Sequence, residues 1–211
     1  PATLLLMATA ITLTVLLGLP AGVLGAVRQN RWPDYLLSLL VVGLLAIPNF
    51  WLGLMLIVAL SVDRGWLPSF GFTGWASLVM PTLALAARLV ALVARMTRGV
   101  MLEELAKDYV RTAHAKGLAV RTVVGRHVLR NALIPTVTVI GLQTGYLLGG
   151  SVVVERLFAW PGVGDLMINA VGARDYTLVQ TITILFVSGF LLINLAVDVL
   201  YLVINPRLRR V

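Results

Sequence analysis

The sequence predicts an all-α protein that crosses a membrane several times, and three observations support this fold class. Hydrophobic residues make up 59% of the chain and charged residues only 12%, against about 25% charged residues in ordinary soluble domains. The mean hydropathy is +0.95. Several stretches without any charge exceed the roughly 18 to 20 residues that a helix needs to cross a bilayer. We therefore expect a polytopic membrane protein with about five transmembrane helices.

Five apolar segments account for these helices. They cover residues 3–27, 35–61, 77–98, 131–153 and 178–204. The second segment contains Pro48, which removes a backbone donor and predicts a kink within one helix. Within the third, residues 77–94 are interrupted only by Arg88, and the fourth is expected to begin at Asn131, a favourable N-cap residue. Residues 154–177 contain proline and glycines and are expected to form an external re-entrant or interfacial turn.

The distribution of charge predicts the orientation. Most of the 17 basic residues fall at positions 28–31, 95–130 and 207–210. Five spans place all three clusters on one side of the membrane, and short loops rich in Lys and Arg stay in the cytoplasm. The net charge of +8 is thus a topology signal, and we expect no nucleic-acid partner. The C-terminus is then cytoplasmic and Pro1 external, which is typical of a fragment that has lost at least one upstream span.

A long basic segment, residues 99–130, separates the third and fourth spans and contains both histidines of the protein. Lys116 and Gly117 are typical of a helix end, with a cation in the last turn followed by a glycine. A second helix is expected to place four valines on one face: Val120, Val123, Val124 and Val128. This second helix suits the membrane surface, where anionic lipid attracts each cation by about 1 kcal/mol. The first, residues 109–116, is Ala-rich and weakly amphipathic, which favours insertion into a groove of a protein partner.

Residues 109–118 and 127–135 resemble the cytoplasmic loop of permease subunits in bacterial ABC importers. The resemblance is to the peptide/nickel branch, and above all to dipeptide and oligopeptide permeases. Residues 48–51, 158–162 and 205–207 agree with it, so that it extends over essentially the whole chain. It implies a single transmembrane domain in the bacterial inner membrane. It also implies a sixth span and an external domain upstream of this region in the full-length family member.

In that family the loop docks on an ATPase subunit. The resemblance implies a coupling role for eight residues: Tyr109, Arg111, Thr112, Ala113, His114, Lys116, Gly117 and Leu118. Arg111 stands where the general permease pattern has an acidic residue, and Gly117 matches the glycine of that pattern. The partners that it implies are a second permease, two cytoplasmic ATPases that bind ATP and Mg, and an extracytoplasmic substrate-binding protein. No cofactor is expected in this chain.

The chain lacks the motifs of an enzyme. A phosphate-binding loop needs glycine directly before lysine, whereas the only lysines, Lys107 and Lys116, both follow alanine. The absence of cysteine excludes thiolate zinc sites and Cys nucleophiles. His114 and His127 have no carboxylate or second histidine at ligand spacing, so no metal site is expected. We expect a non-catalytic subunit whose energy comes from its partners.

Polar residues at membrane depth are candidates for lining a transport pathway: Asn49, Arg88 and Gln143. An arginine at a helix centre costs about 2.5–3.5 kcal/mol on insertion scales. Arg88 is therefore expected either to snorkel or bond a carbonyl group between helices, or to contact a substrate carboxylate. Three glycines at four-residue spacing allow close approach of another helix, in this chain or in a second permease: Gly141, Gly145 and Gly149.

The expected function is that of an importer permease for di- and oligopeptides, with nickel or a glutathione-like compound as the alternative substrate. A second class is an ion-coupled secondary transporter, which often shows inverted repeats and acidic residues at mid-membrane. The sequence shows no such repeat, and the only acidic residue within a span is Asp198, near its inner end. A membrane scaffold without a pathway is the third possibility.

Overall fold

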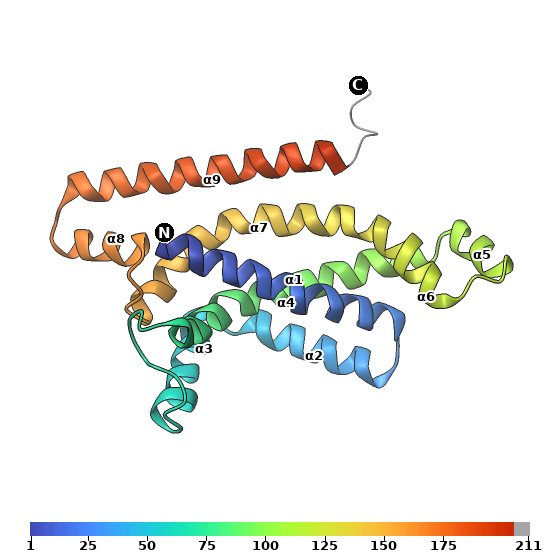
Figure 1. Cartoon of the computed structure of the whole chain (residues 1–211), viewed down its shortest axis with the longest axis horizontal. Coiled ribbons are helices and arrows are strands. Elements are labelled where there is room, and N and C mark those ends of the chain that lie inside the picture. The colour runs from blue at the N-terminus through green and yellow to red at the C-terminus, as the bar shows by residue number, and fades with distance from the viewer. Residues whose placement is uncertain (205–211) are drawn as a thin grey trace.

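The computed structural model describes residues 1–204, without the side chains of Asp198 and of residues 200–204, and this part is helical with no strand (Figure 1). Four helices are long and apolar enough to cross a membrane, and a bent pair makes up to five spans. The predicted all-α polytopic fold is confirmed. The helices are α1 (Ala2–Val27), α2 (Trp32–Ala46), α3 (Asn49–Leu56), α4 (Val79–Leu105), α5 (Asp108–Ala115), α6 (Val120–Thr122), α7 (Leu129–Leu157), α8 (Val163–Gly172) and α9 (Tyr176–Ile204).

The centre of the bundle is formed by α1, α4 and α7, with α2 against α4 and α9 against α7. Small residues allow α1 and α4 to lie close together. A Cβ atom at Gly22 would come within 2.6 Å of the Ala94 carbonyl oxygen, and one at Gly18 within 3.1 Å of the Val90 carbonyl oxygen. Helices in membranes associate through such close backbone packing. The main apolar core fills the space between these helices and includes the fully buried Leu6, Met80 and Val154.

The prediction of one kinked helix over residues 35–61 is wrong. The chain leaves the helix at Ile47, and the axes of α2 and the following segment differ by 103°. Ile47 has extended dihedral angles (φ −82°, ψ 124°), because the ring of Pro48 disfavours helical angles in the residue before it. The helix begins again at Asn49 and continues as a π-helix from Ile57 to Val62. Asn49 thus occupies the N-terminal end of a new helix.

The predicted start of the fourth span at Asn131 is also wrong. One continuous helical segment runs from Val120 to Leu157, with a π-helical stretch over Val123–Val128. Pro135 lies inside this segment, and the Asn131 side chain donates to the Tyr109 hydroxyl at 3.4 Å instead of capping a helix. The expected second loop helix is therefore the first part of the span. Similarly, α4 continues to Leu105, beyond the predicted end at residue 98.

Residues 154–177 contain the helix α8, where an irregular turn was expected. The carboxyl group of Glu155 is fully buried and accepts the backbone amide of Gly164 at 2.7 Å, in the first turn of α8. The Trp160 indole donates to the carbonyl oxygen of Ala2 at 3.1 Å, and the Val163 amide donates to the Thr3 hydroxyl at 2.9 Å. These bonds join α8 to α7 and to the beginning of α1.

Glu155→Leu is expected to lower the thermal stability of the detergent-solubilised protein more than Glu155→Gln. The leucine removes an acceptor and leaves buried amides of α8 without a partner, at about 1–3 kcal/mol for each buried unsatisfied group. The glutamine still offers a carbonyl oxygen. Melting temperatures of both variants, followed by monodispersity on size-exclusion chromatography, measure the difference. A melting temperature of Glu155→Leu equal to that of the native protein would show that Glu155 does not stabilise α8.

Candidate coupling and translocation sites

The helix α5 projects from one end of the bundle, at the right of Figure 1. The connection between α1 and α2 lies at the same end, so the basic residues 28–31 and the segment that contains α5 are close in space, as their charge predicted. Arg64 and Arg174 lie at the opposite end of the bundle. Arg64 is in the connection that leads to α4, and Arg174 is in the connection between α8 and α9. The third predicted basic cluster, residues 207–210, lies outside the described residues.

One face of α5 is buried in a small apolar cluster of its own. Val110 and Ala113 are buried there, together with Met101 of α4 and with Val123 and Val128 of the π-helical stretch. The weak amphipathicity expected for this helix is therefore wrong, because two inward residues one turn apart are enough to seat a helix of eight residues. Ala113, predicted as a coupling contact, packs inward.

A polar network holds α5 to both neighbouring helices. The Tyr109 hydroxyl donates to Glu104 Oε2 of α4 at 2.8 Å and accepts from Asn131 Nδ2 of α7 at 3.4 Å. Lys107 forms an ion pair with the other oxygen of Glu104. Burial, and to a smaller extent the hydrogen bond to Glu104, raises the pKa of Tyr109 above its usual value, which favours the protonated hydroxyl that donates to Glu104. Tyr109 thus anchors α5 through contacts inside the chain.

The other predicted coupling residues are exposed and form the outer surface of α5: Arg111, Thr112, His114, Lys116, Gly117 and Leu118. The helix ends as predicted, with Gly117 in the left-handed region at φ 76°. The Gly117 amide donates to the His114 carbonyl oxygen at 2.9 Å and the Leu118 amide to that of Ala113 at 3.2 Å, which is a Schellman motif. This cap fixes the direction in which the chain leaves the outer surface.

A buried ion pair at the same end was missed by the sequence analysis. Asp34 is 2% exposed. The guanidinium of Arg98 donates to both of its oxygens, at 2.6 Å and 2.7 Å, and the Asn30 amide donates to one of them at 3.0 Å. The pair joins α2 to α4. A single acidic residue beside a basic cluster was the available signal, but the 64 residues between the partners hid the pairing.

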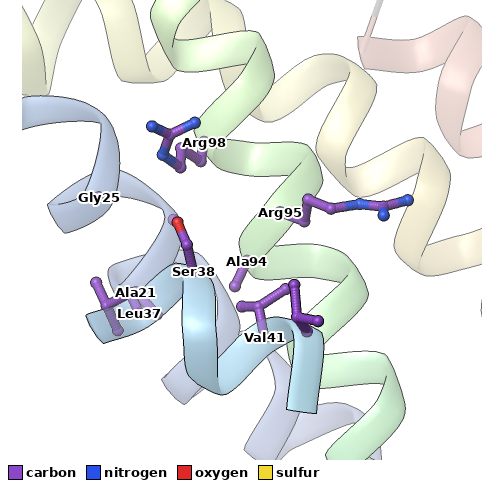
Figure 2. A pocket seen from close by; sticks show the side chains of 10 residues that line it. Ala21, Gly25, Leu37, Ser38, Val41, Ala94, Arg95 and Arg98 are labelled. Carbon is purple, nitrogen blue, oxygen red and sulfur yellow. The ribbon is translucent and has the colours of Figure 1, made fainter. Parts of the chain in front are cut away.

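A pocket of about 240 Å³ lies beside this ion pair, between α1, α2 and α4 (Figure 2). Its lining is mostly apolar and includes Ala21, Leu37, Val41 and Ala94. Arg98 lies at its edge, and Figure 2 shows Arg95 extending from α4 away from α2. The packing of small side chains and the ion pair hold the three helices together around it.

The three residues predicted to line a pathway meet in a different pocket. Asn49 of α3, Arg88 of α4 and Gln143 of α7 line one pocket of about 190 Å³, together with Tyr146. Arg88 is exposed in this chain. Of the three glycines, Gly141 and Gly145 lie against Val197 and Phe190 of α9, whereas a Cβ placed at Gly149 meets no other helix of the described residues within 4 Å.

A comparison with known families identifies the class of protein to which this α-helical membrane bundle belongs. Residues 18–210 match the family described as "Binding-protein-dependent transport system inner membrane component". The protein belongs to this family and is a permease subunit of a binding-protein-dependent ABC importer of the inner membrane.

Individual proteins similar to this chain are known within the family. The chain is 48% identical to the "Glutathione transport system permease protein GsiC" of Escherichia coli K12 over 207 residues, which is 98% of this chain and 68% of the relative. It is 47% identical, with the same coverage, to the protein of that name in Shigella boydii. The fold is that of a chain in the inward-facing MetNI methionine ABC transporter, with a TM-score of 0.80, 23% identity and coverage of 97% and 93% of the two chains.

Proposed function

We propose that this chain forms, with a second permease, the membrane pathway of an importer for glutathione and related short peptides. Two separate ATPases, which hold ATP and Mg, dock on the outer surface of α5. The observation that supports docking is the division of α5 into a buried face and an exposed face at one end of a permease. Glutathione is the first substrate to test, because a 48% identical relative carries that name.

The anchoring of α5 supports a mechanism for coupling. Tyr109 links α5 to Glu104 of α4 and to Asn131 of α7, and the apolar cluster around Val110 joins the same helices. A displacement of α5 by the ATPases is therefore transmitted to α4 and α7 together. These two helices also carry Arg88 and Gln143 of the polar pocket. Closure of the ATPase pair thus changes the pathway without any chemistry in this chain.

Copurification from native membranes tests the docking proposal. In the full chain, Arg111, His114 and Lys116 are changed together to Glu, which reverses or adds charge on the exposed face of α5 and spares its buried face. Arg28→Glu with Arg31→Glu is the matched control, since both arginines are exposed at the same end of the bundle. We expect ATPase subunits to copurify with the native protein and the control and to be lost from the α5 variant.

The same material separates the rival functions. Absence of ATPase subunits from the native sample in mild detergent would contradict the importer mechanism. Uptake that survives ATP depletion and fails when the ion gradient is collapsed would favour an ion-coupled transporter. A complete reconstituted complex that is impermeable to glutathione, dipeptides and nickel would favour a scaffold. Uptake of nickel without uptake of either peptide would replace the proposed substrate.

A further inference from the structure

The polar pocket near the middle of α4 and α7 is electropositive. It combines the guanidinium of Arg88 with the side-chain amides of Asn49 and Gln143, each from a different helix, and with the ring of Tyr146. No Asp or Glu is among its lining residues. Both amide side chains can donate hydrogen bonds, and the guanidinium can donate two in parallel to a planar anion. The pocket therefore presents donors and positive charge toward one small space.

Arg88 has no counter-ion in the part of the chain that the structure describes. Its guanidinium forms neither a salt bridge nor a hydrogen bond with residues 1–197, and it is exposed on the face where α3, α4 and α7 meet. A carbonyl partner between helices, one of the interpretations of the sequence, is thus not observed among these residues. Charged residues within membrane spans are normally paired and mark substrate or ion pathways.

The break in the helix at Pro48 adds to the positive electrostatic potential of the pocket. Asn49 is the first residue of α3 and lines the pocket, so the N-terminal end of that helix lies beside Arg88. The first amides of a helix have no partner within it, and the helix dipole is positive at this end. In transporters with discontinuous helices, such ends point at anionic groups of the substrate near the middle of the membrane.

The size of the pocket limits what it can hold. Its volume of about 190 Å³ is below the roughly 300–1,000 Å³ of sites that enclose a whole small molecule. It fits one end of a substrate, such as a carboxylate with its adjoining carbon atoms. We infer that Arg88, Asn49 and Gln143, with the N-terminal end of α3, form a binding point for a carboxylate of the passing peptide. This inference rests on the proposed function and specifies the substrate group that the pathway recognises.

Uptake of matched acids and amides tests the inference. The complete importer is reconstituted in liposomes, and uptake is measured for glutathione and for a dipeptide without acidic side chains, the dipeptide both as the free acid and as the C-terminal amide. All are supplied at concentrations that saturate the binding protein, so that the rate reports passage through the permease. We expect Arg88→Gln to reduce uptake of the free dipeptide about 10-fold, the effect of losing a charged hydrogen bond, and to leave the amide unchanged. Arg88→Lys is expected to retain most of the uptake.

The control is Arg31→Gln, an exposed arginine at the end of the bundle that is expected to change nothing. An equal reduction for acid and amide, or no change for either, would overturn the carboxylate site while ATP-driven uptake by the native complex upholds the proposed function. Loss of the second permease from the Arg88→Gln complex would also overturn it, since Arg88 would then pair with a partner's carboxylate. Failure of the native complex to take up any form would overturn the proposed function itself.

Discussion

Gly117→Leu is expected to leave ATP hydrolysis by the assembled importer largely intact and to abolish most of its substrate uptake. Gly117 has φ 76°, a conformation that costs a side chain with a Cβ atom about 1–2 kcal/mol. The leucine therefore disfavours the Schellman bonds to His114 and Ala113 and redirects the chain at the end of the docking surface. The measurement is the number of substrate molecules taken up per ATP hydrolysed in proteoliposomes.

Gly117→Asn is the matched control, because asparagine tolerates the left-handed region better than other residues with a side chain. A Cβ atom at position 117 has no neighbour within 4 Å in the described residues, so neither substitution produces a steric clash inside the chain. Any difference between the two variants then reports backbone conformation. Normal coupling in Gly117→Leu would show that the cap of α5 is irrelevant to energy transfer.

Asp34→Ala is expected to destabilise the protein by about 3 kcal/mol, the lower end of the cost of removing one partner of a buried ion pair. The lower end applies because the side chain of Arg98 is 32% exposed, so that its charge remains partly solvated when Asp34 is removed. The loss weakens the contact between α2 and α4 next to the pocket of Figure 2. Thermal unfolding of the solubilised protein measures it as a lower melting temperature.

Replacing both partners distinguishes the contribution of the ion pair from that of the space which the two side chains fill. Asp34→Leu with Arg98→Leu leaves no buried charge, and such apolar replacements are often neutral or stabilising. We expect the double variant to recover most of the melting temperature that Asp34→Ala loses. A double variant as unstable as the single one would show that α2 is held by contacts other than this pair.

The apolar segments and the glycine at the end of α5 were predictable because they depend on local sequence. Length and absence of charge predict a helix in a membrane, and Gly117 after Lys116 predicts where α5 ends. The consequences of Pro48 were underestimated: a proline can produce a mild kink or a complete break, and packing decides between them. Here α3 packs against α4 and α7 at 103° to α2, which no pattern around Pro48 indicates.

The anchors of the candidate site depend on contacts between distant residues. Tyr109 was predicted to face a partner, but the acceptor and the donor that bind it come from α4 and α7. Asn131 was predicted as an N-cap because asparagine is favoured at that position, and the local sequence does not show that its side chain bonds a distant residue instead. No sequence pattern predicted the role of Glu155, because its carboxyl group accepts a backbone amide of α8, a contact that depends on how α8 packs against α7.

The bonds from Trp160 to Ala2 and from Val163 to Thr3 span 158 and 160 residues, and they determine the order in which the bundle can be completed. During synthesis α1 emerges long before α8, so this end of α1 must wait in the bilayer with its carbonyl and hydroxyl groups bound to water or lipid. The two bonds can form only after α7 has been inserted and the chain has turned back into α8. The end of the bundle opposite α5 is therefore completed only late in synthesis, when α8 has been made.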